Sequence, residues 1–117
     1  MIKLSEYSIQ QTFHNWCKKQ PYILEHWHVP NGMHSSPKEC AKMKKVGLHD
    51  GVCDYWILLS TGIIVAIEFK TDVGVASQQQ MKFIHNLQKC NIPVEICRDT
   101  YTAVQFVKKI YKKSLTL

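Results

Sequence analysis

The sequence has no long apolar run, which excludes an ordinary membrane-spanning protein. None of its hydrophobic segments approaches the roughly 20 residues that a transmembrane helix needs. The N-terminal segment Met-Ile-Lys-Leu-Ser-Glu also lacks the apolar stretch of a secretory signal. We therefore expect a cytoplasmic protein with no membrane partner.

The cysteines lack paired spacing. There are five of them, at positions 17, 40, 53, 90 and 97, and none forms a Cys-x-x-Cys pair. A disulfide framework favours an even number, and a structural zinc site favours paired ligands. We expect reduced thiols without a shared role.

Several catalytic motifs are also missing. The chain has neither a phosphate-binding P-loop nor a Gly-x-Ser-x-Gly elbow, and nothing indicates a small organic cofactor. His26 and His28 would share one face of a strand and could bind a metal, but no third ligand is evident. A cysteine–histidine nucleophile also stays open, although nothing marks one cysteine as activated.

Arginine is nearly absent although the chain is basic. Lys and Arg number 15 against nine Asp and Glu, a net charge of +6, and Arg98 is the single arginine. Lysine is a point charge that suits phosphate contacts better than bidentate base reading. If the partner is a nucleic acid, this favours backbone or shape recognition, although solubility alone could explain the charge.

The 117 residues have room for one domain, residues 1–117. Hydrophobic periodicity, caps and turn residues predict the order α-β-β-β-α-β-α, a mixed α/β fold with a central sheet flanked by helices. The predicted helices cover residues 5–19, 77–89 and 100–113, and the predicted strands cover 22–29, 54–59, 63–69 and 93–97. Residues 33–50 show no period and are predicted to be a long basic surface loop. Four candidate DNA-binding lysines cluster there: Lys38, Lys42, Lys44 and Lys45.

A central hairpin carries the candidate chemistry. If Ser60-Thr61-Gly62 is its loop, Asp54 lies directly opposite Glu68, and Lys70 follows on the same face roughly 7 Å further along. Facing carboxylates have Cβ atoms about 4.5–5.5 Å apart and repel each other. A divalent cation between them would remove the repulsion, and oxygen ligands favour Mg²⁺ or Mn²⁺. Alternatively, Asp54 ends its strand in solvent and Glu68 simply pairs with Lys70.

Two polar residues share the inner faces of predicted helices. Glu6 precedes Ile9 by three positions, so it shares the buried stripe of the first helix, or it is simply a favourable carboxylate near a helix N-terminus. Gln80 faces inward from the helix that Ser77 opens. Ser77-Gln78-Gln79-Gln80 also fits a capping box, so Gln80 has either a capping or a site role.

Together these residues read Gly51-x-x-Asp54, Glu68-x-Lys70 and Ser77-x-x-Gln80. This resembles the PD-(D/E)XK nuclease superfamily and specifically the VRR-NUC family. The likeness extends to Glu6 with Ile9-Gln10 and to Pro30-Asn31-Gly32, so it covers nearly the whole chain. Cys53 stands where the superfamily's name has proline, and the segment around 38–50 matches the family pattern poorly.

The resemblance implies the roles of the site residues. Glu6, Asp54 and Glu68 would bind Mg²⁺ or Mn²⁺, with the Phe69 carbonyl as a further ligand. Lys70 would orient or deprotonate the attacking water, and Gln80 would position Lys70 or the phosphate. Asp54, Glu68, Lys70 and Gln80 would thus form the catalytic set.

The resemblance also implies a setting. Stand-alone members of this size occur in phages and bacteria, so the cytoplasm would be that of a bacterial cell or a phage-infected host. A homodimer acting on branched DNA, such as a Holliday junction, is implied, since two-fold symmetry suits paired cuts. A non-catalytic DNA-binding module on the same fold, and a nuclease for flaps or plain duplex, are the alternatives.

Overall fold

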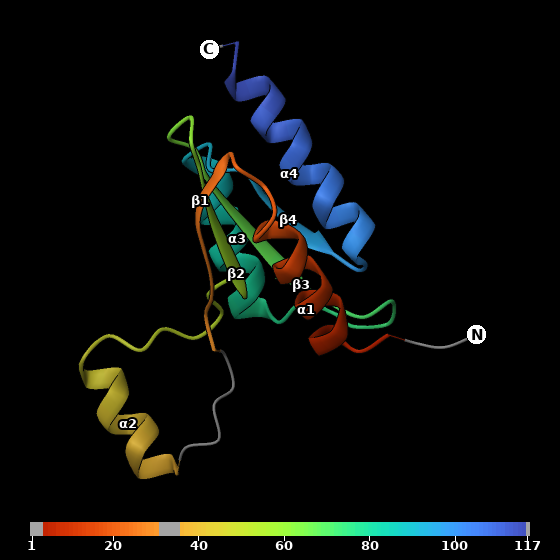
Figure 1. The fold of residues 1–117 in the computed structure, drawn as a ribbon. Coiled ribbons are helices and arrows are strands. Elements are labelled where there is room, and N and C mark those ends of the chain that lie inside the picture. Colours follow the sequence, from red (N-terminus) through yellow and green to blue (C-terminus); the bar gives the residue numbers. More distant parts are fainter. Residues whose placement is uncertain (1–3, 31–35, 117) are drawn as a thin grey trace.

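The computed structural model describes residues 4–30 and 36–116. Its helices are α1 (Glu6–Cys17), α2 (Pro37–Lys45), α3 (Gln78–Lys89) and α4 (Thr100–Ser114), and its strands are β1 (Ile23–His28), β2 (Tyr55–Leu59), β3 (Ile64–Phe69) and β4 (Val94–Cys97) (Figure 1). The order confirms the predicted mixed α/β fold, with α2 as an addition. Across the described part of the chain, no helix is both long and apolar enough to span a membrane.

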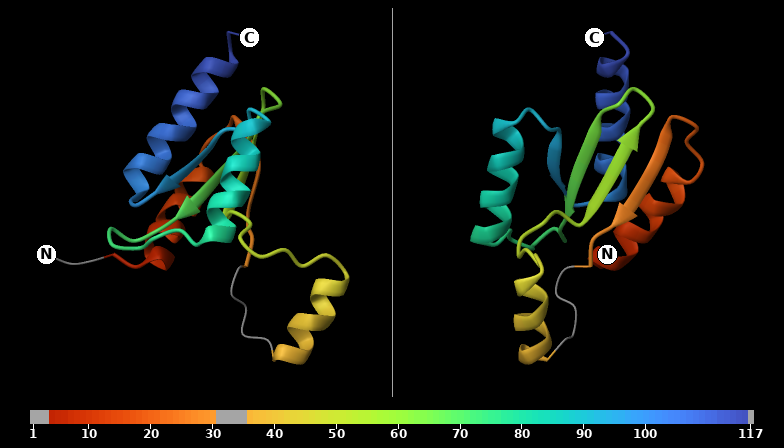
Figure 2. Two further views of the ribbon diagram at one scale, coloured as in Figure 1. Left: turned by 180° about the vertical axis from the view of Figure 1, so that it is seen from behind. Right: turned by 90° about the vertical axis from the view of Figure 1, so that its left-hand side faces the viewer.

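Within the described residues, the strands form one sheet in the order β1-β2-β3-β4. The pairs β1–β2 and β2–β3 are antiparallel, whereas β4 pairs with β3 in parallel. The parallel pair is joined through α3, the crossover that parallel strands require. Helices α1 and α4 cover one face of the sheet and α3 covers the other (Figure 2).

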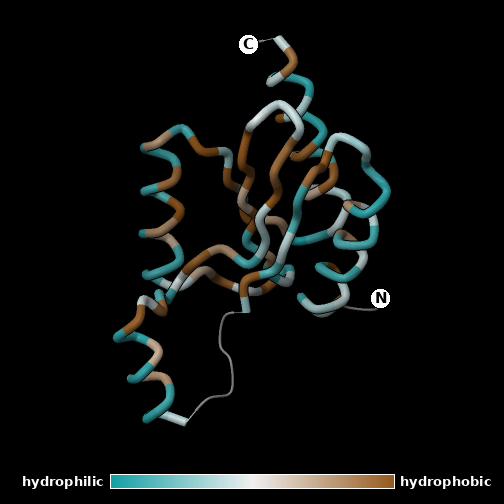
Figure 3. Tube along the Cα trace, turned by 60° about the vertical axis from the view of Figure 1, so that its left-hand side comes forward, coloured by the Kyte–Doolittle hydropathy of each residue, from teal (hydrophilic) through white to brown (hydrophobic). Residues whose placement is uncertain are grey.

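The alternation of side chains along the strands divides the core between these two faces. Tyr55, Ile57 and Leu59 of β2 pack with α1 and α4, whereas Ala66 of β3 packs with Ile84 of α3. The apolar colour in Figure 3 is accordingly concentrated on the central strands. Glu68 lies two residues beyond Ala66 and therefore belongs to the α3 face.

The predicted hairpin register is correct. Tyr55 pairs with Ile67 and Leu58 with Ile64, which is the pairing that a Ser60-Thr61-Gly62 loop requires. Asp54 lies one residue before β2, and its carboxylate reaches the backbone of β3. The predicted meeting of Asp54 with the Glu68 end of the hairpin is therefore present.

The prediction that residues 33–50 form only a loop is wrong, because α2 lies within this segment. Ser36 caps α2 by accepting a hydrogen bond from the Glu39 N–H at 3.2 Å, and Pro37 occupies the first turn. None of the nine residues of α2 is buried, and the helix projects away from the sheet (Figures 1 and 2). A helix without a buried face has no apolar period to detect, although Ser36-x-x-Glu39 is a capping signal.

Candidate active site

Asp54 is fixed between two strands at one end of the sheet. Its carboxylate Oδ2 accepts the Phe69 N–H at 2.9 Å, and its backbone carbonyl accepts the Val29 N–H at 2.7 Å. Gly51, just upstream, approaches the first turn of α3 so closely that an added Cβ would lie 2.7 Å from the Gln79 backbone. Its φ of +85° also favours glycine. The Gly51-x-x-Asp54 motif thus holds the aspartate in place against β3 and α3.

Glu68 is the buried charged residue of the site. It is 1% exposed, its Oε2 accepts a hydrogen bond from Gln80 Nε2 at 3.2 Å, and Lys70 Nζ lies 3.7 Å from the same oxygen. The other oxygen, Oε1, is buried without a hydrogen-bond partner among the described residues. An unpaired buried carboxylate oxygen is costly, so this atom is suited to a cation.

The electrostatics of Glu68 agree with this geometry. Burial raises the pKa of Glu68 well above its ordinary value, and the adjacent Asp54 carboxylate raises it further. The Lys70 ammonium opposes the shift, and the charge of Glu6 adds to it. One lysine therefore does not neutralise the acidic groups at this end of the sheet.

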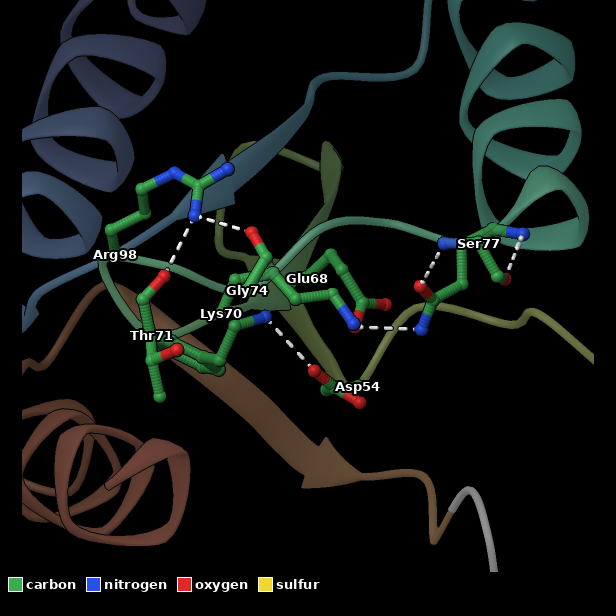
Figure 4. Close-up of polar contacts among 9 residues, drawn as sticks. Asp54, Glu68, Lys70, Thr71, Gly74, Ser77 and Arg98 are labelled. Atoms are coloured by element: carbon green, nitrogen blue, oxygen red, sulfur yellow. Dashed lines mark hydrogen bonds and ion pairs between the residues drawn. The ribbon is translucent and has the colours of Figure 1, made fainter.

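Gln80 has both of the roles that the sequence left open. Its Oε1 accepts the Ser77 N–H at 2.8 Å and its own N–H donates to Ser77 Oγ at 3.1 Å, which completes the capping box. Its Nε2 is then left to donate to Glu68. The cap of α3 therefore orients the amide that holds the buried carboxylate (Figure 4).

Lys70 is bonded to β4 through its backbone, and Arg98 clamps the loop that follows it. Its N–H donates to the Cys97 carbonyl at 3.1 Å, and its side chain is only 12% exposed. Arg98 Nη1 donates to the carbonyls of Thr71 and Gly74, each at 2.7 Å (Figure 4). Sequence reasoning missed this clamp, because its acceptors are backbone carbonyls that leave no side-chain signature.

Glu6 lies in the first turn of α1 and is exposed, so its predicted place on the buried stripe is wrong. Residues near a helix start can face outward although they share the spacing of the stripe. Within residues 4–30 and 36–116, no three His, Cys, Asp and Glu side chains gather closely enough to hold a metal ion. The structure therefore brings together Asp54, Glu68, Lys70 and Gln80, with the Phe69 backbone beside Asp54. Glu6 lies farther away and affects Glu68 only through its charge.

The candidate DNA-binding lysines Lys38, Lys42, Lys44 and Lys45 are all exposed on α2. Lys44 makes a surface ion pair with Asp50 at 3.3 Å. Residues 46–53 connect α2 to Asp54, so the basic helix precedes the acidic site in the chain and projects away from the sheet (Figure 1).

The histidines of residues 4–30 and 36–116 do not form a metal centre. The Nδ1 atoms of His14 and His26 lie within hydrogen-bond distance of the Tyr55 hydroxyl, at 2.6 and 2.7 Å. His26 therefore has a structural hydrogen-bond partner. His28 Nδ1 instead lies 2.9 Å from the Gln10 amide. The alternative metal site at His26 and His28 has no third ligand among the described residues.

Comparisons with known proteins agree with this arrangement. A sequence model of the VRR-NUC domain matches residues 4–100, which include every candidate site residue. A solved structure described as a VRR_NUC domain protein superposes with a TM-score of 0.76 at 22% identity, covering 96% of this chain and 92% of that chain. At this identity the structural likeness shows the fold alone. A comparison with curated protein sequences found no significant match.

Proposed function

Because the chain belongs to the VRR-NUC family, a nuclease-type domain family, we propose that it is a metal-dependent endonuclease that hydrolyses phosphodiester bonds in branched DNA. The single observation that carries the proposal is the buried Glu68 carboxylate, with Oε1 unpaired and Oε2 held by Gln80 and Lys70. Oε1 has no hydrogen-bond partner among the described residues, and Asp54 lies close enough to raise the pKa of Glu68, so a catalytic cation would give Oε1 a partner and offset the repulsion between the two carboxylates.

The donor set fits Mg²⁺ or Mn²⁺. Asp54 and Glu68 offer carboxylate oxygens, and the Phe69 carbonyl is a further candidate, which is the hard oxygen chemistry that these ions prefer. Glu6 stays a predicted ligand and contributes negative charge from α1. When bound, the ion would neutralise charge on the phosphate and lower the pKa of water.

The protein groups have complementary tasks. The Lys70 ammonium, held beside Glu68, orients the attacking water and stabilises the charge that builds up on the phosphate. Gln80 keeps the Glu68 carboxylate in one orientation. The water oxygen forms a bond to phosphorus as the bond to the leaving oxygen breaks; the attacking water gives up one proton to the solvent, and the leaving oxygen takes one up from the solvent.

The basic helix α2 supplies the contact to the DNA backbone. Lys38, Lys42, Lys44 and Lys45 lie on a helix that projects from the sheet and is joined to Asp54 by residues 46–53 (Figure 1), where they would bind phosphates outside the cut site. We also propose a homodimer, because a two-fold symmetric enzyme suits paired cuts in a four-way junction.

The test is gel-resolved cleavage of a labelled four-way junction beside matched flap and linear duplex substrates. Wild type and Lys70→Ala are compared in Mg²⁺, Mn²⁺ and EDTA. Metal-dependent cutting of the junction alone, lost in the variant, supports the full proposal. Equal cutting of every substrate supports nuclease activity and contradicts a preference for branched DNA. Binding without any cutting favours a non-catalytic DNA-binding module.

A further inference from the structure

A hollow of about 290 Å³ opens between α1 and the neighbouring strands, outside the catalytic set. We call it the α1–β1 hollow. Its lining residues are polar or aromatic: Tyr7, Gln10, Gln11, His14, His28 and Tyr55. No carboxylate is among these lining residues, so the hollow differs in charge from the acidic site next to it.

The floor and one wall of the hollow are held in place by hydrogen bonds. The Tyr55 hydroxyl is fixed between His14 Nδ1 and His26 Nδ1, at 2.6 and 2.7 Å. Gln10 lies one turn before His14 on α1, and its amide lies 2.9 Å from His28 Nδ1. The hollow therefore presents an amide and an imidazole in defined positions.

The same contacts connect the hollow to the candidate active site. His28 Nδ1 also lies 3.2 Å from the carbonyl of Asp54, whose carboxylate is bound to β3. Glu6, one turn before Gln10 on α1, is close enough to Glu68 for its charge to raise the pKa of that residue. The hollow therefore lies beside the end of the sheet that carries Asp54.

Tyr7 lies at the mouth of the hollow, and its side chain is 75% exposed. An exposed aromatic ring beside hydrogen-bonding groups is the combination with which proteins hold unpaired bases, by stacking on the ring and bonding to the base edge. A volume of about 290 Å³ is large enough to receive one planar base.

We propose that the α1–β1 hollow binds one unpaired nucleobase of the DNA strand that enters the candidate active site, stacked on Tyr7 and hydrogen-bonded by Gln10 and His28. This inference rests on the proposed function and deepens it, because it gives the site a physical preference for DNA with unpaired bases. A base inside a duplex already uses its faces for stacking and its edge for pairing, so it cannot enter.

The test measures binding in EDTA, where no cleavage occurs. The substrate is a forked duplex with 2-aminopurine placed in turn at each unpaired position next to the fork. Stacking on Tyr7 quenches the fluorescence of this base analogue, so wild type should quench it strongly at one position. The variants are Tyr7→Ala, Tyr7→Phe and Gln10→Ala, and Tyr101→Ala, which removes a tyrosine on α4 that is 74% exposed, is the matched control.

Tyr7→Ala should abolish the quenching and weaken binding to the fork about tenfold, a typical effect of losing one aromatic–base stack. Tyr7→Phe and Tyr101→Ala should bind the fork within about twofold of wild type, and all variants should bind a fully paired duplex equally well. Unchanged fork binding by Tyr7→Ala, or an equal loss on paired duplex, would overturn the inference.

The outcome is separable from that of the proposed function. The protein could show quenching at one position that depends on Tyr7 and yet cut no substrate in Mg²⁺ or Mn²⁺. This result would contradict the proposed nuclease activity and support base binding in the hollow. Alternatively, the protein could cut DNA in a metal-dependent way while Tyr7→Ala leaves its affinity for the fork unchanged. This result would support the proposed nuclease activity and contradict base binding in the hollow.

Discussion

The amide of Gln80 donates to the buried carboxylate of Glu68 at 3.2 Å while the other end of the same amide caps α3. One side chain thus connects the start of a helix to the centre of the candidate site. Because the cap fixes which end of the amide faces Glu68, the orientation of the carboxylate depends on the geometry of the helix start. This relationship gives the first prediction.

Gln80→Glu should separate the capping role from the site role. Glutamate is a good capping-box residue at this position, so α3 should keep its stability. The new carboxylate would face Glu68, and the repulsion should lower the cleavage rate at least about tenfold. Ser77→Ala is the control, since it should cost about 1 kcal/mol of unfolding free energy but leave the amide facing Glu68. Paired urea denaturation and cleavage measurements check this, and full activity of Gln80→Glu would contradict it.

Glu68→Gln should remove the response of the protein to divalent ions. In EDTA the variant should be at least as stable as wild type, because a buried acid with an unpaired oxygen, beside the Asp54 carboxylate, is replaced by a neutral amide of the same shape. Mn²⁺ should raise the melting temperature of wild type only, since an ion at 100 times its Kd adds about 2.7 kcal/mol. Glu95→Gln, at an exposed carboxylate on β4, is the matched control. An equal Mn²⁺ shift in Glu68→Gln and wild type would place the ion elsewhere.

Arg98→Lys should loosen the loop that follows Lys70. Lysine keeps the charge, but its ammonium is a strongly hydrated point charge on a flexible stem, whereas the planar Arg98 guanidinium holds both N–H donors of Nη1 toward the carbonyls of Thr71 and Gly74. Amide hydrogen exchange should speed up in residues 71–76. Cleavage should slow about three- to tenfold, because small displacements of catalytic groups cost rate. Arg98→Ala should increase the exchange rate and lower the cleavage rate more than Arg98→Lys does. If hydrogen exchange in residues 71–76 is unchanged in either variant, the Arg98 hydrogen bonds do not order this loop.

Replacing Lys38, Lys42 and Lys45 together by alanine should weaken DNA binding without affecting folding. Alanine preserves helix propensity, and α2 has no buried residue to disturb. Each lost phosphate contact lowers the slope of log affinity against log salt by about 0.9, so the slope should fall by roughly 2–3. Lys108, Lys109 and Lys112 on α4 provide a control with the same change in charge. Equal loss of affinity in both triple variants would indicate only a general effect of charge.

The stability of α4 should depend on pH through Asp99. Its carboxylate accepts the Thr102 N–H at 2.7 Å, and this bond lowers the pKa of Asp99. A lowered pKa means that the stabilisation is complete above the ordinary value of about 4 and disappears as the pH falls through the lower folded value. Asp99→Asn should keep the cap and lose this pH dependence, whereas Asp99→Ala should cost about 1 kcal/mol at pH 7. Urea midpoints measured between neutral and acidic pH check both, and a wild-type pH dependence retained in Asp99→Asn would assign it to another group.

The sequence by itself determined the elements whose signals are local or periodic. The hairpin register followed from the three-residue loop and the alternation of side chains, and it placed Asp54 at the Glu68 end of β3 correctly. Caps at Ser5 and Ser77 gave the starts of α1 and α3. These features could be predicted because each depends on neighbours within a few residues, or across a single turn.

Only the tertiary structure decided the features that depend on distant parts of the chain. Helix α2 has no buried face and hence no apolar period, so its existence rested on weak capping signals. The exposure of Glu6, the Arg98 clamp and the contact of Gln10 with His28 each depend on how α1, β1 and the loop after β3 pack together. Partners in such contacts are far apart in sequence, and many of the atoms involved belong to the backbone. The linear order of residue types therefore carries no trace of them.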